Sequence, residues 1–123
     1  MLEHVGLTVF DRSEIKAFYQ SLLGLGLQYD FTIPADLSEN LFGIPKQTRV
    51  YLLSKGNLKL ELFISKRKTP RNYTHICISV ENRKAFIQKA KQKGYECTVV
   101  RREKSDLFFI RDKSNNLFEI KEQ

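Results

Sequence analysis

The sequence predicts an α+β protein made of two similar halves, each with the order strand, helix and a meander of further strands. Three observations lead to this prediction. HVGLTV (4–9) is matched by HICISV (75–80), and each is followed by a stretch of helical periodicity that ends at a glycine. YLLSKGNLKLE (51–61) is likewise matched by FIRDKSNNLFE (109–119). Self-similarity of this kind indicates an internal repeat.

The first strand of each half is predicted from apolar residues at alternate positions, from 5 to 9 and from 76 to 80. Side chains alternate across a strand, so the apolar set faces the core and packs under the helix. His4 and His75 then lie on the opposite face of their strands.

A helix follows each strand. Asp11 and Asn82 are the expected N-caps, and Gly24 and Gly94 stand where helix C-caps are expected. The apolar stripe is clear in the first helix and thinner in the second: Ile15, Phe18, Tyr19 and Leu22, then Phe86, Ile87 and Ala90. The basic residues around the second stripe are interpreted as a solvated face rather than a nucleic-acid footprint.

The later strands of each half are predicted on both sides of a tight Lys-x-Asn turn, with Gly56 or Asn115 in the positive-φ position. The first half also contains an irregular excursion over 32–47, with a turn of helix expected around 37–42. This excursion is a functional loop or a simple insertion. The chain is therefore expected to be one domain over 1–123, made of module 1 (1–65), a linker (66–72) and module 2 (73–123).

Composition places the chain among soluble globular proteins, with 41% hydrophobic and 28% charged residues. No apolar run approaches the roughly 20 residues of a membrane span, and the first strand leaves no room for a signal peptide, so we expect a cytoplasmic protein. The net charge of +7 favours anionic partners. Cys77 and Cys97 belong to no CxxC pair and are expected to be reduced, buried thiols.

Four side chains with the chemistry of metal ligands are expected on the face opposite the helices. Strand parity puts Glu61 and Glu119 on that face, together with His4 and His75. Each residue alone is more often structural, but an unpaired carboxylate there would be costly, and the repeat relates the four in pairs. Two nitrogens and two oxygens suit one divalent metal ion such as Zn, Ni, Co, Mn or Fe.

The chain resembles the vicinal oxygen chelate superfamily, which includes glyoxalase I, methylmalonyl-CoA epimerase, extradiol dioxygenases and bleomycin- and fosfomycin-resistance proteins. The resemblance lies in HVGLTVFDRSEIKAFYQSLLGL (4–25), HICISVENRKAFIQKAKQKGYE (75–96) and FFIRDKSNNLFEIKE (108–122). In the last segment KSNN replaces the usual Pro-Asp-Gly-Asn. The resemblance implies two βαβββ modules whose curved mixed sheets enclose a central cleft, commonly in a homodimer.

The resemblance also implies that His4, Glu61, His75 and Glu119 are the metal ligands, a set most similar to that of bacterial glyoxalase I. Epimerases of the superfamily usually carry glutamine at the Glu61 position. The implied function is a metal-dependent lyase or isomerase, similar to lactoylglutathione lyase, that chelates a substrate through adjacent oxygens and stabilises an enediolate. Glu61 or Glu119 would be the catalytic base that moves the proton.

Other functions stay open at this stage. The protein could bind or sequester a small molecule without metal or turnover, as in antibiotic resistance, or epimerise an acyl-CoA or related metabolite. A nucleic-acid partner is ranked last because no recognition motif is present, and no membrane partner is expected. Candidate contacts to a small anionic substrate are Lys59, Phe63 and Cys77.

Overall fold

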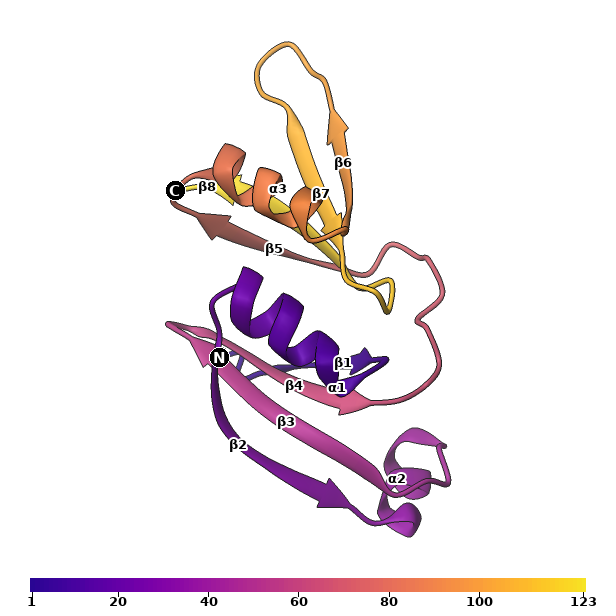
Figure 1. Cartoon of the computed structure of the whole chain (residues 1–123). Coiled ribbons are helices and arrows are strands. Elements are labelled where there is room, and N and C mark those ends of the chain that lie inside the picture. The colour runs from indigo at the N-terminus through magenta and orange to yellow at the C-terminus, as the bar shows by residue number, and fades with distance from the viewer. The chain divides into compact units, whose positions relative to one another are not determined.

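A computed structural model describes all residues from Met1 to Gln123, which form two compact units, Met1–Lys68 and Thr69–Gln123. Each unit holds one four-stranded mixed sheet, with strand orders β1-β4-β3-β2 and β5-β8-β7-β6. The two orders correspond strand by strand, and each unit follows the order βαβββ, to which the first unit adds one helix between its second and third strands (Figure 1). The predicted α+β class with two tandem βαβββ modules is therefore confirmed. The assignment of 66–72 as a linker stays a prediction.

The first unit has β1 and β4 as parallel neighbours, and its other strand pairs are antiparallel. A short α-helix runs directly into a π-helical segment, and together they lie across one face of the sheet (Figure 1). Its elements are β1 (Val5–Val9), α1 (Arg12–Glu14), η1 (Ile15–Leu22), β2 (Gly26–Ile33), α2 (Ala35–Phe42), β3 (Thr48–Lys55) and β4 (Leu58–Ile64).

The second unit repeats this arrangement with β5 and β8 as its parallel pair. A loop over 101–106 stands where the first unit has α2. Its elements are β5 (His75–Val80), α3 (Arg83–Gln92), β6 (Glu96–Val100), β7 (Leu107–Arg111) and β8 (Leu117–Glu122).

The predicted helix caps and turns are present. The Asp11 side chain accepts a hydrogen bond from the backbone N–H of Ser13 at 2.8 Å, and the Asn82 side chain accepts one from Ala85 at 2.9 Å. Both glycines that follow the helices have positive φ, as do the two predicted turn residues: Gly24, Gly94, Gly56 and Asn115. Local sequence chemistry therefore decides where these elements begin and end.

Loss of the Asn82 cap should destabilise the protein modestly. Asn82→Ala removes the side chain that accepts from the Ala85 N–H, whereas Glu122 still accepts from the Arg83 N–H, and we expect the free energy of unfolding to fall by about 1 kcal/mol. Urea denaturation measures this change. Gln88→Ala, in the exposed middle of the same helix, is the matched control and should change stability by less than about 0.5 kcal/mol.

The core of each unit lies between its sheet and its long helix. The predicted stripe of η1 is fully buried, and in α3 Ile87 and Ala90 are buried while Phe86 is half-buried. The apolar residues of β5 are also only half-buried. The expectation of a buried thiol is wrong for Cys77, which is exposed because it lies on the same face of β5 as His75. Cys97 is intermediate.

Candidate functional site

His4 and Glu61 form a pair in the first unit. His4 directly precedes β1, and Glu61 lies on the neighbouring strand β4, in register with Gly6. The His4 Nε2 and Glu61 Oε1 atoms are 2.9 Å apart, and the side chains are 47% and 19% exposed. The carboxylate is thus largely shielded, whereas the imidazole stays accessible from the open face of the sheet.

His75 and Glu119 form the corresponding pair in the second unit. His75 begins β5, and Glu119 lies on β8 in register with Cys77. The His75 Nε2 and Glu119 Oε2 atoms are 3.9 Å apart, and the side chains are 45% and 17% exposed. The two pairs therefore have nearly equal exposure as well as equal composition.

The His75 ring is held by a second contact. Its Nδ1 lies 2.8 Å from the backbone carbonyl oxygen of Tyr73. A carbonyl oxygen can only accept a hydrogen bond, so Nδ1 is the protonated nitrogen and donates it. In the neutral ring the lone pair then resides on Nε2, the atom that faces Glu119. This is the orientation that metal-binding histidines commonly have.

The two pairs occupy the same register in their sheets. In each unit the histidine stands two residues before the residue that pairs with the glutamate, which is Gly6 in the first unit and Cys77 in the second. Because side chains alternate along a strand, each histidine and glutamate emerge on the same face of their sheet. The predicted common face is thus confirmed within each unit.

Neither unit by itself gathers three or more His, Cys, Asp or Glu side chains that could hold a metal ion. Each unit brings together one imidazole nitrogen and one carboxylate group. The combined donor chemistry of the two pairs, two nitrogens and two carboxylates, fits a borderline divalent metal such as Zn or Mn. A set of four ligands requires both units, and that set remains a proposal.

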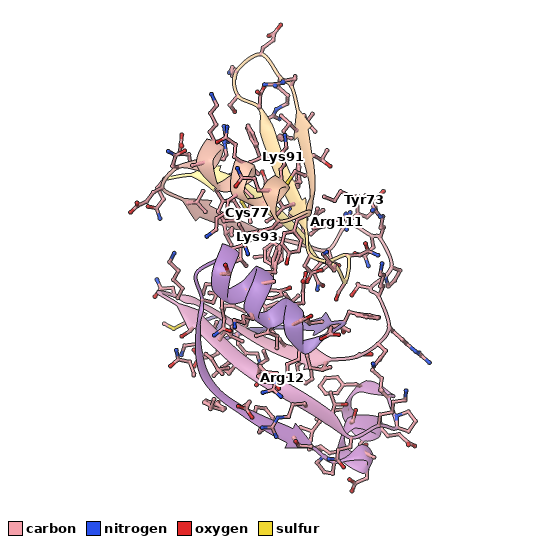
Figure 2. The ribbon with its side chains drawn as sticks, in the orientation of Figure 1. Arg12, Tyr73, Cys77, Lys91, Lys93 and Arg111 are labelled. Carbon is pink, nitrogen blue, oxygen red and sulfur yellow. The ribbon has the colours of Figure 1, made fainter.

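The three predicted substrate contacts lie on strands that carry the ligand candidates. Lys59 is exposed and Phe63 half-buried on β4. Cys77, labelled in Figure 2, is exposed on β5. Partial burial, and secondarily the Glu119 carboxylate, raise the pKa of the Cys77 thiol above its ordinary value. The thiol is therefore protonated at neutral pH, which disfavours a nucleophilic role.

A cavity of about 390 Å³ opens on the face of β1 and β4 that carries His4 and Glu61. The sequence predicted Phe63 as a substrate contact and left the excursion over 32–47 as a functional loop or a simple insertion; it did not predict that the excursion encloses a cavity together with Phe63. The excursion contains α2, a longer helix than expected, and its residues form one wall. The lining residues are Gly6, Leu7, Thr8, Ser38, Phe42, Ile44, Lys46, Gln47, Thr48, Phe63, Ile64, Ser65 and Lys66.

A second, more polar depression of about 530 Å³ lies in the second unit beside Glu119. Its walls include Arg83, Arg102 and Lys121, and the Arg83 guanidinium stacks over the Phe108 ring at 4.1 Å from its centre. Three acidic side chains line the same depression, Asp106, Glu119 and Glu122, so its lining is mixed in charge. No helix of the chain is long and apolar enough to cross a membrane.

Comparison with known proteins identifies the family of the chain. Residues 3–109 match the family model described as the Glyoxalase/Bleomycin resistance protein/Dioxygenase superfamily. No protein of curated function matches the sequence.

Three solved structures illustrate the similarity of fold. The glyoxalase family protein from Bacillus cereus is 19% identical, with a TM-score of 0.77 and coverage of 98% of this chain and 92% of that one. A glyoxalase family protein from Enterococcus faecalis is 20% identical, with a TM-score of 0.74 and coverage of 98% and 95%. A variant of the fosfomycin resistance protein FosX from Listeria monocytogenes, complexed with Mn(II) and 1S,2S-dihydroxypropylphosphonic acid, is 19% identical, with a TM-score of 0.76 and coverage of 98% and 90%.

Proposed function

Because the chain belongs to the glyoxalase/bleomycin resistance protein/dioxygenase superfamily, we propose that it is a metal-dependent lyase or isomerase of glyoxalase type. The observation that carries this proposal is the repetition of one His–Glu pair at the same register in two units. Duplication of one half would copy such a pair, and a metal site shared by the two halves gives both copies a common role. Selection for one shared chemical task explains the recurrence.

His4, Glu61, His75 and Glu119 would together hold one divalent metal ion. The two units can come from one chain or from two copies in a homodimer, and the ligand chemistry is the same in both cases. When bound, such an ion supplies Lewis acidity toward a substrate that carries two adjacent oxygen atoms. The fixed Nδ1–H of His75 supports this proposal, since it directs the Nε2 lone pair toward Glu119.

The carboxylates of Glu61 and Glu119 are the candidate bases. Either could take a proton from the carbon next to a substrate carbonyl and return it to the neighbouring carbon, as general acid–base catalysis requires. Glu61 is the better placed of the two for a substrate in the first unit, because its register partner Gly6 lines the cavity there. His4 lies beside that carboxylate, with 2.9 Å between Nε2 and Oε1.

The expected substrate is small and anionic. The net charge of +7 and the two lysines that line the cavity of the first unit favour a negatively charged ligand. The Listeria FosX structure contains Mn(II) and a phosphonic acid with two hydroxyl groups, so one protein of this fold has been seen with a metal and a small anion. This similarity adds support for Mn among the candidate metals Zn, Ni, Co, Mn and Fe.

A second candidate function is binding of a small molecule without turnover. It is favoured by the contact between His4 and Glu61, which satisfies both side chains without a metal ion. This candidate predicts the same cavity but no bound metal and no effect of chelators.

The deciding experiment measures the metal content of untagged protein by mass spectrometry, beside Glu119→Gln. We expect near-stoichiometric metal in the wild type and an affinity lowered by about 10- to 100-fold in the variant, which keeps the shape but not the charge of the ligand. Glu81→Gln, exposed and outside the site, is the matched control and should keep its metal. The loaded protein would then be screened with 2-oxoaldehyde hemithioacetals and acyl-CoA epimers. Absence of metal in the wild type, even after soaking, would contradict the enzyme proposal and leave the second candidate.

A further inference from the structure

The cavity of the first unit has apolar walls that suit a flat ligand. Phe63 lies on its floor on β4, and Phe42 of α2 meets the Phe63 ring edge to face, with ring centres 5.3 Å apart. Phe42 is 52% exposed, and Leu41 and Ile44 beside it are exposed as well, so that this end of α2 presents neighbouring apolar side chains of the kind that mark binding sites. Because the two rings already touch each other, a further flat group would pack against their open faces and edges rather than between them.

Gly6 makes room for the floor of the cavity. A Cβ atom at this position would lie 3.3 Å from Cε2 of Phe63, closer than an ordinary van der Waals contact. A side chain at position 6 would therefore press on the Phe63 ring or occupy the cavity. The glycine lets Phe63 lie against β1 while leaving the space above it open.

The charged groups of the cavity are all of one sign. Lys46 and Lys66 line it, and no aspartate or glutamate does. One buried polar residue is also present, since Ser38 of α2 lines the cavity and is only 2% exposed. A hydroxyl group in that position can hydrogen-bond a polar atom of a ligand, and two ammonium groups select for negative charge.

The cavity adjoins the candidate metal ligands. Among the lining residues, Gly6 and Phe63 are the nearest in sequence to His4 and Glu61. Gly6 is also in register with Glu61. Gly6 is two residues from His4, which corresponds to about 7 Å along an extended strand. A ligand of ordinary size could therefore fill the cavity and still reach the His4–Glu61 pair, because cavities of about 300 Å³ or more accept such molecules.

We propose that this cavity is the specificity pocket of the protein and that it binds the aromatic or other flat apolar body of an anionic small molecule. Phe42 and Phe63 hold the body, and Lys46 and Lys66 pair with a carboxylate or similar anionic group. As an assignment of the substrate class, this inference rests on the proposed function. As an assignment of a binding site, it stands on the cavity alone.

The test uses phenylacetate and its uncharged analogue phenylacetamide as probes, with the full chain treated with a chelator. Backbone amide shifts in two-dimensional NMR report where each probe binds. We expect phenylacetate to shift the amides of cavity residues such as Gly6, Ser38 and Lys46, and to bind at least about threefold more tightly than the amide, as expected for partly exposed ion pairs.

Variants separate the two parts of the pocket. Lys46→Gln with Lys66→Gln should weaken phenylacetate binding by about 3- to 10-fold and remove its advantage over phenylacetamide. Phe42→Ala should weaken both probes equally. Leu41→Ala and Lys68→Gln are matched controls, since Leu41 is exposed beside Phe42 and neither residue lines the cavity. Both controls should bind as the wild type does.

The result that would overturn the inference is equal binding of acid and amide, or shifts that spread over both units without following the cavity. Measuring the metal content of the same variants distinguishes this outcome from a failure of the proposed function. If the protein binds metal but not phenylacetate, the pocket assignment fails and the enzyme proposal stands. If phenylacetate binds in the cavity but no metal is ever bound, the cavity is a binding site and its assignment as a substrate pocket is overturned.

Discussion

Replacing His4 by alanine is expected to lower the affinity of the chain for its metal ion by at least about 100-fold, and replacing His75 should have the same effect. The reason is that one ion shared by all four ligands loses a direct bond in either variant. Loss of an outer-shell partner alone commonly costs 10- to 100-fold, so loss of a ligand should cost no less. The double variant should show no detectable binding in competition with a chromophoric chelator.

Stoichiometry makes this prediction specific for a shared ion. If each His–Glu pair instead held its own ion, the wild type would bind two ions per chain and each single variant would still bind one with unchanged affinity. A shared site gives one ion per chain in the wild type, whether the units belong to one chain or to two. Thermal unfolding of the metal-free variants is the control, because both histidines are nearly half exposed and their removal should leave the fold intact.

The fold could be predicted from the sequence because its determinants are local and repeated. Strand parity, an N-cap such as Asn82 and a positive-φ position such as Asn115 each depend on a few neighbouring residues. The repeat then tests each assignment twice. For the same reason the sheet face of Glu61 and Glu119 could be predicted before the strands were paired.

The cavity could not be predicted because it depends on contacts between distant segments. Phe42 contacts Phe63 only because the chain places α2 against β4, and no periodicity in the excursion over 32–47 specifies where α2 packs. The protonated nitrogen of His75 depends in the same way on the carbonyl group of Tyr73 in the irregular segment before β5. The exposure of Cys77 was misjudged because an apolar run suggested burial, although its parity places it beside His75.

The sequence KSNN (113–116) stands in place of the usual Pro-Asp-Gly-Asn, and the hydrogen bonds of Asp112 and Asn115 explain why this turn still forms. Asp112 is 4% exposed, and its side chain accepts hydrogen bonds from the backbone N–H of Ser114 at 2.8 Å and of Asn116 at 2.9 Å. Its other oxygen accepts one from the Asn116 side-chain amide at 2.8 Å. Asn115 provides the positive φ and donates a hydrogen bond to the Thr69 carbonyl at 3.1 Å. The carboxylate therefore organises the turn that leads into β8 and Glu119.

Replacing Asp112 by alanine should lower the free energy of unfolding by about 3 to 5 kcal/mol, since it leaves three hydrogen-bond donors of a buried turn without this acceptor. Chemical denaturation measures the change. Asp112→Asn keeps one carbonyl oxygen for the two backbone donors and should lose only about half as much. Asp106→Ala is the matched control, because that carboxylate bonds Arg101 and Arg102 at a partly exposed site, and it should cost much less stability than Asp112→Ala. Equal losses for Asp112→Ala and Asp106→Ala would mean that the buried turn is not what holds β7 and β8 in register.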